Sequence, residues 1–172
     1  MLLEFTRSIH GAWRIARMDP DALNYFNLTI DGFWRSFMAL LIVAPFYVVF
    51  LVLNHGNQPG LELPTGPFVS TEYYVGVKLI AFTIGWLMFP LLMVPLSRLL
   101  DLSQNYVQYI IVYNWSNVLV MAVILPMVLL FPPASPAGES AKLILMAAQI
   151  TMLFYGYLVA RIGLQCKTLT AI

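Results

Sequence analysis

Four segments of this chain are each apolar over 20 or more residues, at about residues 33–53, 73–96, 105–131 and 141–164. About 20 helical residues are enough to cross the ~30 Å hydrocarbon core of a bilayer. A helix can span lipid because its backbone groups bond to one another within the segment. The sequence therefore predicts an all-α polytopic membrane protein, with four transmembrane helices in a compact bundle.

The overall composition supports this fold class. Of the 172 residues 60% are apolar and 10% are charged, whereas a soluble domain is roughly 45–50% apolar and about a quarter charged. The net charge is +1, and the nine Lys and Arg residues are too dispersed to form a nucleic-acid surface. Cys166 is the single cysteine, so the chain has no intrachain disulfide and no cysteine metal cluster.

Residues 1–31 are too polar to span and are predicted to form cytosolic or interfacial amphipathic helices. Apolar and basic side chains each recur there at helical spacing, the apolar set being Leu2, Phe5, Ile9, Trp13 and Ala16 and the basic set Arg7, His10, Arg14 and Arg17. This pattern fits a helix lying among the headgroups with Trp13 at the boundary, or a helix packed on the cytosolic ends of the spans. Charge appears too early for the apolar core of a signal peptide.

A second short helix is expected after the first. Asp19 can cap it, Pro20 suits its first position, and it would run to about Leu28 before Asp31-Gly32 breaks it. The aromatic and basic residues that follow would anchor the first span at the interface. The predicted membrane-surface residues are Arg7, Trp13, Arg14, Arg17, Trp34 and Arg35.

Prolines and a cap mark the spans themselves. Pro45 predicts a kink in the first span, and Pro90 and Pro95 predict that the second half of the second span is bent or partly unwound. Ser70 is expected to begin the second span.

Basic residues indicate the orientation. Seven of the nine fall in the N-terminal region, the turn after the second span, or the C-terminal end of the chain, and the other two lie just inside spans. By the positive-inside rule both termini face the cytoplasm, and residues 166–172 form a cytosolic tail. We expect a multi-pass protein of the bacterial inner (plasma) membrane, with the four-span bundle at residues 32–165.

The third span is polar on two sides. Tyr and Asn side chains form a stripe about 100° wide on a helical wheel, with amides and a Trp on the opposite side and Asn114 between them. The first side holds Tyr106, Tyr109, Tyr113, Ser116 and Asn117, and the second Gln104, Gln108 and Trp115. Buried amides need partners, so they either join helices or line a cavity for a polar ligand, headgroup or ion. Two polar sides favour a central helix or one side facing a partner.

Two further polar residues lie within spans. Lys78 shares a helix side with Ala81 and Gly85, so it either snorkels to the interface or contacts an anion or headgroup from a helix-contact face. Gln149 shares a small-residue side of the fourth span and is expected to bond to the third span's amides. The predicted ligand or partner contacts are Tyr106, Tyr109, Tyr113, Asn114, Asn117, Gln149 and Lys78.

Enzyme signatures are missing from the sequence. No His, Cys, Asp and Glu set has metal-ligand spacing, and His10 and His55 are predicted on opposite sides of the membrane. No acidic residue lies deep in a span, which argues against a proton-coupled or sodium-coupled transporter. We predict no catalytic residues, no metal and no cofactor.

Two stretches carry a family resemblance, Asp31-Gly32-Phe33-Trp34 at the start of the first span and Val112-Tyr113-Asn114-Trp115-Ser116 followed by Pro126. They resemble the Yip family of Rab-GTPase-interacting membrane proteins, in its bacterial branch. The resemblance implies a cytosolic N-terminal region and a helical bundle without catalytic residues. The family usually has five spans and a eukaryotic Asp-Leu-Tyr-Gly-Pro pattern, and this chain has neither.

These features together indicate a non-enzymatic integral membrane protein. It would act as a scaffold, accessory subunit or membrane-organising factor through the polar side of the third span. Its expected partners are the lipid bilayer and another membrane protein or a second copy, with no nucleic acid. The alternative is a small transporter or channel for a polar solute, lined by the third span, and an enzyme acting on lipids is the third interpretation.

Overall fold

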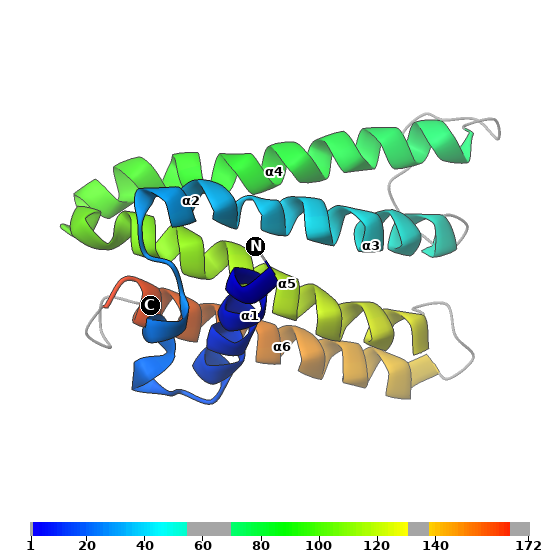
Figure 1. Cartoon of the computed structure of the whole chain (residues 1–172). Helices are drawn as coiled ribbons and strands as arrows, with labels where there is room; N and C mark the ends of the chain where they lie inside the picture. The colour runs from blue at the N-terminus through cyan, green and yellow to red at the C-terminus, as the bar shows by residue number, and fades with distance from the viewer. Residues whose placement is uncertain (1, 55–69, 131–137, 166–172) are drawn as a thin grey trace.

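A computed structural model describes residues 2–54, 70–130 and 138–165, and every regular element in these ranges is helical. In chain order the elements are α1 (Leu2–Ala16), the 3₁₀ helix η1 (Pro20–Tyr25), α2 (Ile30–Ser36), α3 (Met38–Asn54), α4 (Thr71–Leu99), the 3₁₀ helix η2 (Ser103–Asn105), α5 (Tyr106–Leu130) and α6 (Gly138–Gly163). The long helices lie lengthwise beside one another, and α1 crosses α5 and α6 (Figure 1).

The described residues contain four helical stretches long and apolar enough to cross a membrane, at Ile30–Val52, Thr71–Leu99, Ser103–Met127 and Leu143–Gly163. The predicted fold class, a helical four-span membrane protein with an N-terminal helix, is confirmed. Arg35, Arg98 and Arg161 lie where α2 ends, α4 ends and α6 ends, at the same end of the bundle as the start of α5. We call this end the basic end.

Helix α5 is the centre of the bundle. It packs against α1, α2, α3, α4 and α6. Of the residues in an apolar 18-residue stretch of each span, 39% are buried in the third span but only 11% in the second. The central position expected for a helix with two polar sides is therefore observed.

The first span is divided in two, whereas the sequence predicted a single helix at 33–53 with a kink at Pro45. Helix α2 ends at Ser36 and α3 begins at Met38, with Pro45 inside α3. At the break, the Ser36 hydroxyl donates to the carbonyl of Phe33 at 2.7 Å. The break lies nearer the basic end than Pro45 does, and it turns Ser36 toward α5.

The sequence predicted that Asp31 and Gly32 break a helix. In the structure they lie in the first turn of α2 instead. Thr29 caps this helix, because its hydroxyl accepts a hydrogen bond from the Gly32 amide at 3.1 Å. Asp31 suits this position, since a carboxylate is favourable near the positive end of a helix dipole.

Two predicted caps are confirmed, and the partial unwinding considered for the second span is absent. Asp19 accepts from the Asp21 amide at 2.9 Å and begins η1, which ends at Tyr25 rather than near Leu28. Ser70 accepts from the Tyr73 amide at 3.3 Å and begins α4. Helix α4 continues through both of its prolines without unwinding, which neighbouring helices and hydroxyl groups make possible in a span.

Candidate functional site

The side chain of Asn114 joins three helices inside the bundle. It is 0% exposed. Its Nδ2 donates to Ser36 Oγ at 2.8 Å, and its Oδ1 accepts from Trp86 Nε1 at 3.0 Å. Ser36 is also fully buried, and its hydroxyl donates in turn to the Phe33 carbonyl. The amide is therefore bonded at both ends by groups from α2 and α4.

The tyrosine side of α5 faces α4. The Tyr106 hydroxyl donates to the Pro90 carbonyl at 3.0 Å, in the half of α4 that contains both prolines. The Tyr113 ring stacks on Phe89 with a centroid separation of 4.0 Å, and Tyr109 lies against the same ring at 6.1 Å. These tyrosines therefore hold α4 to α5.

The amide side of α5 faces the end of α6. Gln108 Nε2 donates to the Gly163 carbonyl, and Asn105 Nδ2, in η2 just before α5, donates to the Leu164 carbonyl, each at 2.8 Å. The last carbonyls of a helix have no partner in the helix itself, and these two side chains supply it. Gly163 lies so close to Tyr109 that a Cβ there would come within 2.9 Å of Tyr109 Cδ2.

Asn117 and Gln149 differ from Asn114, because neither side chain bonds to another helix among the described residues. Asn117 Nδ2 donates to the Tyr113 carbonyl of its own helix at 3.0 Å. The Gln149 side chain is exposed on α6, and the amides of α5 bond to the other groups named above. The expectation that Gln149 would bond to them is wrong, because Gln149 lies on an exposed side of α6. Gly156 of the same helix side is exposed, and a Cβ on it would meet nothing within 4 Å.

Lys78 lies toward the opposite end of the bundle from Arg98. Its ammonium group lies 5.7 Å from the centroid of the Tyr74 ring. Ala81 is exposed, and a Cβ on Gly85 would meet nothing within 4 Å. The small-residue side that Lys78 shares is therefore not a helix contact among the described residues.

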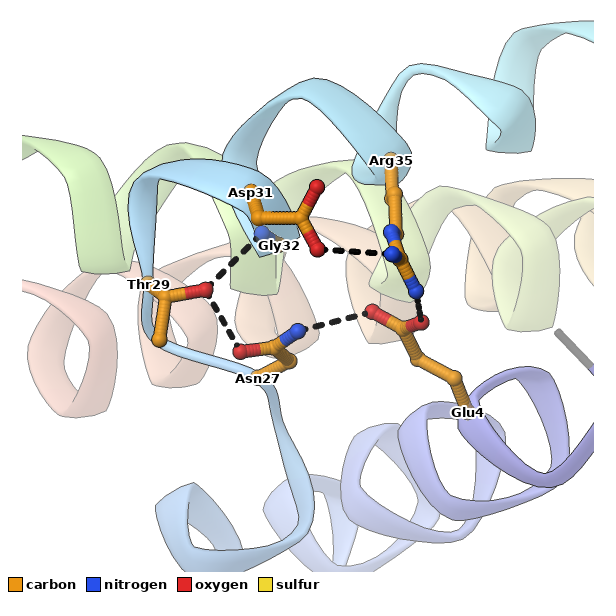
Figure 2. Close-up of polar contacts among 6 residues, drawn as sticks. All are labelled: Glu4, Asn27, Thr29, Asp31, Gly32 and Arg35. Atoms are coloured by element: carbon orange, nitrogen blue, oxygen red, sulfur yellow. Dashed lines mark hydrogen bonds and ion pairs between the residues drawn. The ribbon is translucent and has the colours of Figure 1, made fainter.

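A second polar cluster joins α1 to the start of the first span, as Figure 2 shows. Glu4 accepts from Arg35 Nη1 at 3.1 Å and from Asn27 Nδ2 at 3.2 Å. Arg35 also pairs with Asp31 at 2.8 Å, and the Thr29 hydroxyl donates to Asn27 Oδ1 at 2.8 Å. Glu4 was not among the predicted site residues. The available signal was that Glu4 is the single acidic residue in a basic helix.

Gly32 explains why the chain enters the first span with an Asp-Gly pair. Gly32 is buried against the preceding loop, and a Cβ on it would lie 1.9 Å from the Asn27 carbonyl oxygen. Only glycine allows this approach. It brings Asn27 beside Glu4 and so sets the geometry of the second polar cluster.

Helix α1 packs on α5 and α6 through a face that only partly matches the predicted one, because Phe5 and Ile9 pack against the core but Trp13 and Ala16 do not. Ser8, Ala12 and Ile15 are fully buried, whereas Trp13 is 51% exposed and Ala16 is also exposed. The Tyr155 hydroxyl of α6 donates to the Ala12 carbonyl at 3.0 Å. The helix therefore packs on the spans and leaves Trp13 exposed, and its place among the headgroups stays a prediction.

The basic residues of α1 differ in their partners. Arg14 forms an ion pair with Asp19 and a hydrogen bond to the Tyr25 hydroxyl. The bond from the Asp21 amide, followed by that from Arg14, holds the pKa of Asp19 below its usual value. Arg7 donates to the Asn24 carbonyl at 3.2 Å, and Arg17 is exposed. Trp34 is 69% exposed and Arg35 is exposed, both near the basic end.

Searches with this chain found no matching family model, no similar curated protein and no similar solved structure. The resemblance to the Yip family therefore stays a prediction. Within residues 2–54, 70–130 and 138–165, no three His, Cys, Asp or Glu side chains are placed to hold a metal ion. The contacts described above are hydrogen bonds, ion pairs and packing contacts, most of them between helices.

Proposed function

We propose that this multi-pass membrane protein is a non-enzymatic component of a membrane assembly, acting as a scaffold, accessory subunit or membrane-organising factor. The supporting observation is that Asn114 is fully enclosed and is bonded at both ends within its own chain. The most buried amide of the third span is thus used to hold the bundle. In this proposal the protein lies in the bacterial inner membrane with both termini cytoplasmic, and the partner binds elsewhere than at Asn114.

The exposed side of α6 is the surface that we assign to a partner. Met146, Ile150 and Leu153 are between 55% and 73% exposed there. Gln149 is exposed among them, near the middle of the helix. An amide facing hydrocarbon is unfavourable, and a polar group on a second helix would offset that cost. The partner is another membrane protein or a second copy of the chain.

A photo-crosslinking amino acid at position 153, activated in native membranes, tests this proposal. We expect a discrete product, at twice the mass of the chain for self-association or at another fixed mass for a different protein. Gln149→Leu should weaken the product. The same probe at Leu91, which is exposed on α4, is the control. Equal diffuse labelling from both positions would remove the support for an interface.

The transport alternative draws less support from these contacts. A polar path along α5 would need unpaired groups deep in the span, and Asn114 has both ends of its amide bonded while Asn117 bonds to its own helix. If Asn114→Leu abolished uptake of a polar solute by vesicles while leaving the bundle folded, the transport alternative would replace the assembly proposal.

A further inference from the structure

A groove runs between α5 and α6 on the side that α1 crosses. Its volume is about 480 Å³, within the range of roughly 300–1,000 Å³ that is usual for ligand pockets. The lining is almost entirely apolar and includes Leu119, Val123, Met127, Ala148 and Met152, with Trp13 of α1 among them. These parts of α5 and α6 belong to candidate spans, so the groove opens to lipid rather than to water.

Trp13 also lines a second recess, of about 590 Å³, with a different chemistry. His10, Arg14, Arg17 and Asp19 line it. Because one carboxylate faces two guanidinium groups, the recess has a surplus positive charge. Asp19 is already held by Arg14, which leaves the exposed Arg17 as the cation available to a ligand.

The two recesses meet at a residue suited to a membrane boundary. Trp13 is 51% exposed, and an indole ring prefers the zone between hydrocarbon and water. An apolar groove on one side of this ring and a cationic recess on the other match the two parts of a phospholipid. A water-soluble ligand would match only the cationic recess.

We propose that the chain binds an anionic phospholipid at this place, with an acyl chain in the groove between α5 and α6 and the headgroup phosphate at Arg17. Trp13 lies at the junction between them. The excess of cations favours an anionic headgroup over a zwitterionic one. This inference does not depend on the partner surface of α6, because Gln149 and Leu153 do not line the groove.

Quenching of tryptophan fluorescence by lipids with brominated acyl chains tests the proposal. The full chain is reconstituted in mixed vesicles of phosphatidylcholine and phosphatidylglycerol, with bromine on one lipid at a time. The contribution of Trp13 is the difference between the parent chain and Trp13→Phe. We expect brominated phosphatidylglycerol to quench Trp13 more strongly than brominated phosphatidylcholine at the same mole fraction.

Two variants separate the headgroup from the acyl chain. Arg17→Gln should lower the relative affinity for phosphatidylglycerol roughly fivefold, the effect of one cation near a headgroup. Ala148→Phe should fill the groove and reduce the quenching of Trp13 by both lipids. Their matched controls, Arg98→Gln and Ala81→Phe, change exposed residues on α4 and should have no effect.

Two results would overturn the proposal. Equal quenching of Trp13 by the two lipids, unchanged in Arg17→Gln, would mean that the lipid there is not selected by its headgroup. Unchanged quenching in Ala148→Phe, with the variant still folded by circular dichroism, would mean that no acyl chain occupies the groove.

Discussion

The side-chain amide of Asn114 donates to the hydroxyl of Ser36 across 2.8 Å, although 78 positions separate the two residues in the chain. The bond connects the first half of α5 to the break between α2 and α3. Trp86 completes the arrangement from α4. Three of the four spans thus meet at one buried group, so the bundle depends on it for the mutual placement of its helices.

Replacing this amide should destabilise the bundle. Asn114→Leu leaves the Trp86 indole N–H without its acceptor inside the bundle, a cost of about 1–3 kcal/mol for each orphaned buried group. The free energy of unfolding, measured by denaturant titration in mild detergent, should fall by about that amount. Asn117→Leu is the control, because Asn117 bonds only to a carbonyl of its own helix, and it should cost less than about 1 kcal/mol. An equal loss in both variants would contradict the central role of Asn114.

Gly32 should tolerate no side chain. A Cβ there would lie 1.9 Å from the Asn27 carbonyl oxygen, so Gly32→Ala must displace the loop that holds Asn27 beside Glu4. We expect a loss of about 1–3 kcal/mol, as for overpacking in a core. Gly85→Ala has open space around it and should be neutral or stabilising by up to about 1 kcal/mol through helix propensity. Thermal unfolding of the two variants side by side measures the difference.

Two glycines of α6 should respond differently to the same substitution. Gly163→Ala brings a Cβ within 2.9 Å of a Tyr109 ring atom and 3.3 Å of the Tyr109 Cα. It should separate the end of α6 from α5 and cost about 1–3 kcal/mol. Gly156→Ala meets nothing within 4 Å in the chain and, like Gly85→Ala, should be neutral or stabilising by up to about 1 kcal/mol in detergent. A comparable loss from Gly156→Ala would mean that this face is packed even in the isolated chain.

The turn between α1 and η1 should weaken in acid. The pKa of Asp19 is lowered in the folded protein, so its contribution is present above the unfolded pKa and is lost as the pH falls through the folded pKa. The stability difference between the parent chain and Asp19→Asn should therefore shrink as the pH is lowered from neutral to below 3.8, the ordinary pKa of an Asp carboxyl. Arg14→Gln removes one of the two main causes of the shift and should reduce this pH dependence. Melting temperatures over a pH series provide the measurement.

Much of the fold follows from local sequence properties. The four spans follow from apolar length, because about 20 apolar residues satisfy both the hydrocarbon thickness and the backbone. The caps at Asp19 and Ser70 follow from side chains within three residues of the amides that they bond. The central place of α5 follows from its two polar sides, since both need partners inside the protein.

The partners of individual side chains were decided by the tertiary structure. Asn114 bonds to Ser36 rather than to a residue of the fourth span, because the first span breaks at Phe37 and turns a hydroxyl toward α5. Glu4 finds Arg35 through a loop packed on Gly32. Trp13 faces outward because α1 is rotated so that Ala12 and Ile15 face the spans.

The physical reason is the geometry of the helix. Each residue adds 100° of rotation, so a small change in how one helix rolls against another exchanges the residues that touch. Hydropathy and caps depend on neighbours along the chain, so the sequence by itself determined that four spans form and where η1 and α4 begin. The roll and depth of each helix depend on close packing between segments far apart in sequence, and only the folded bundle decided them.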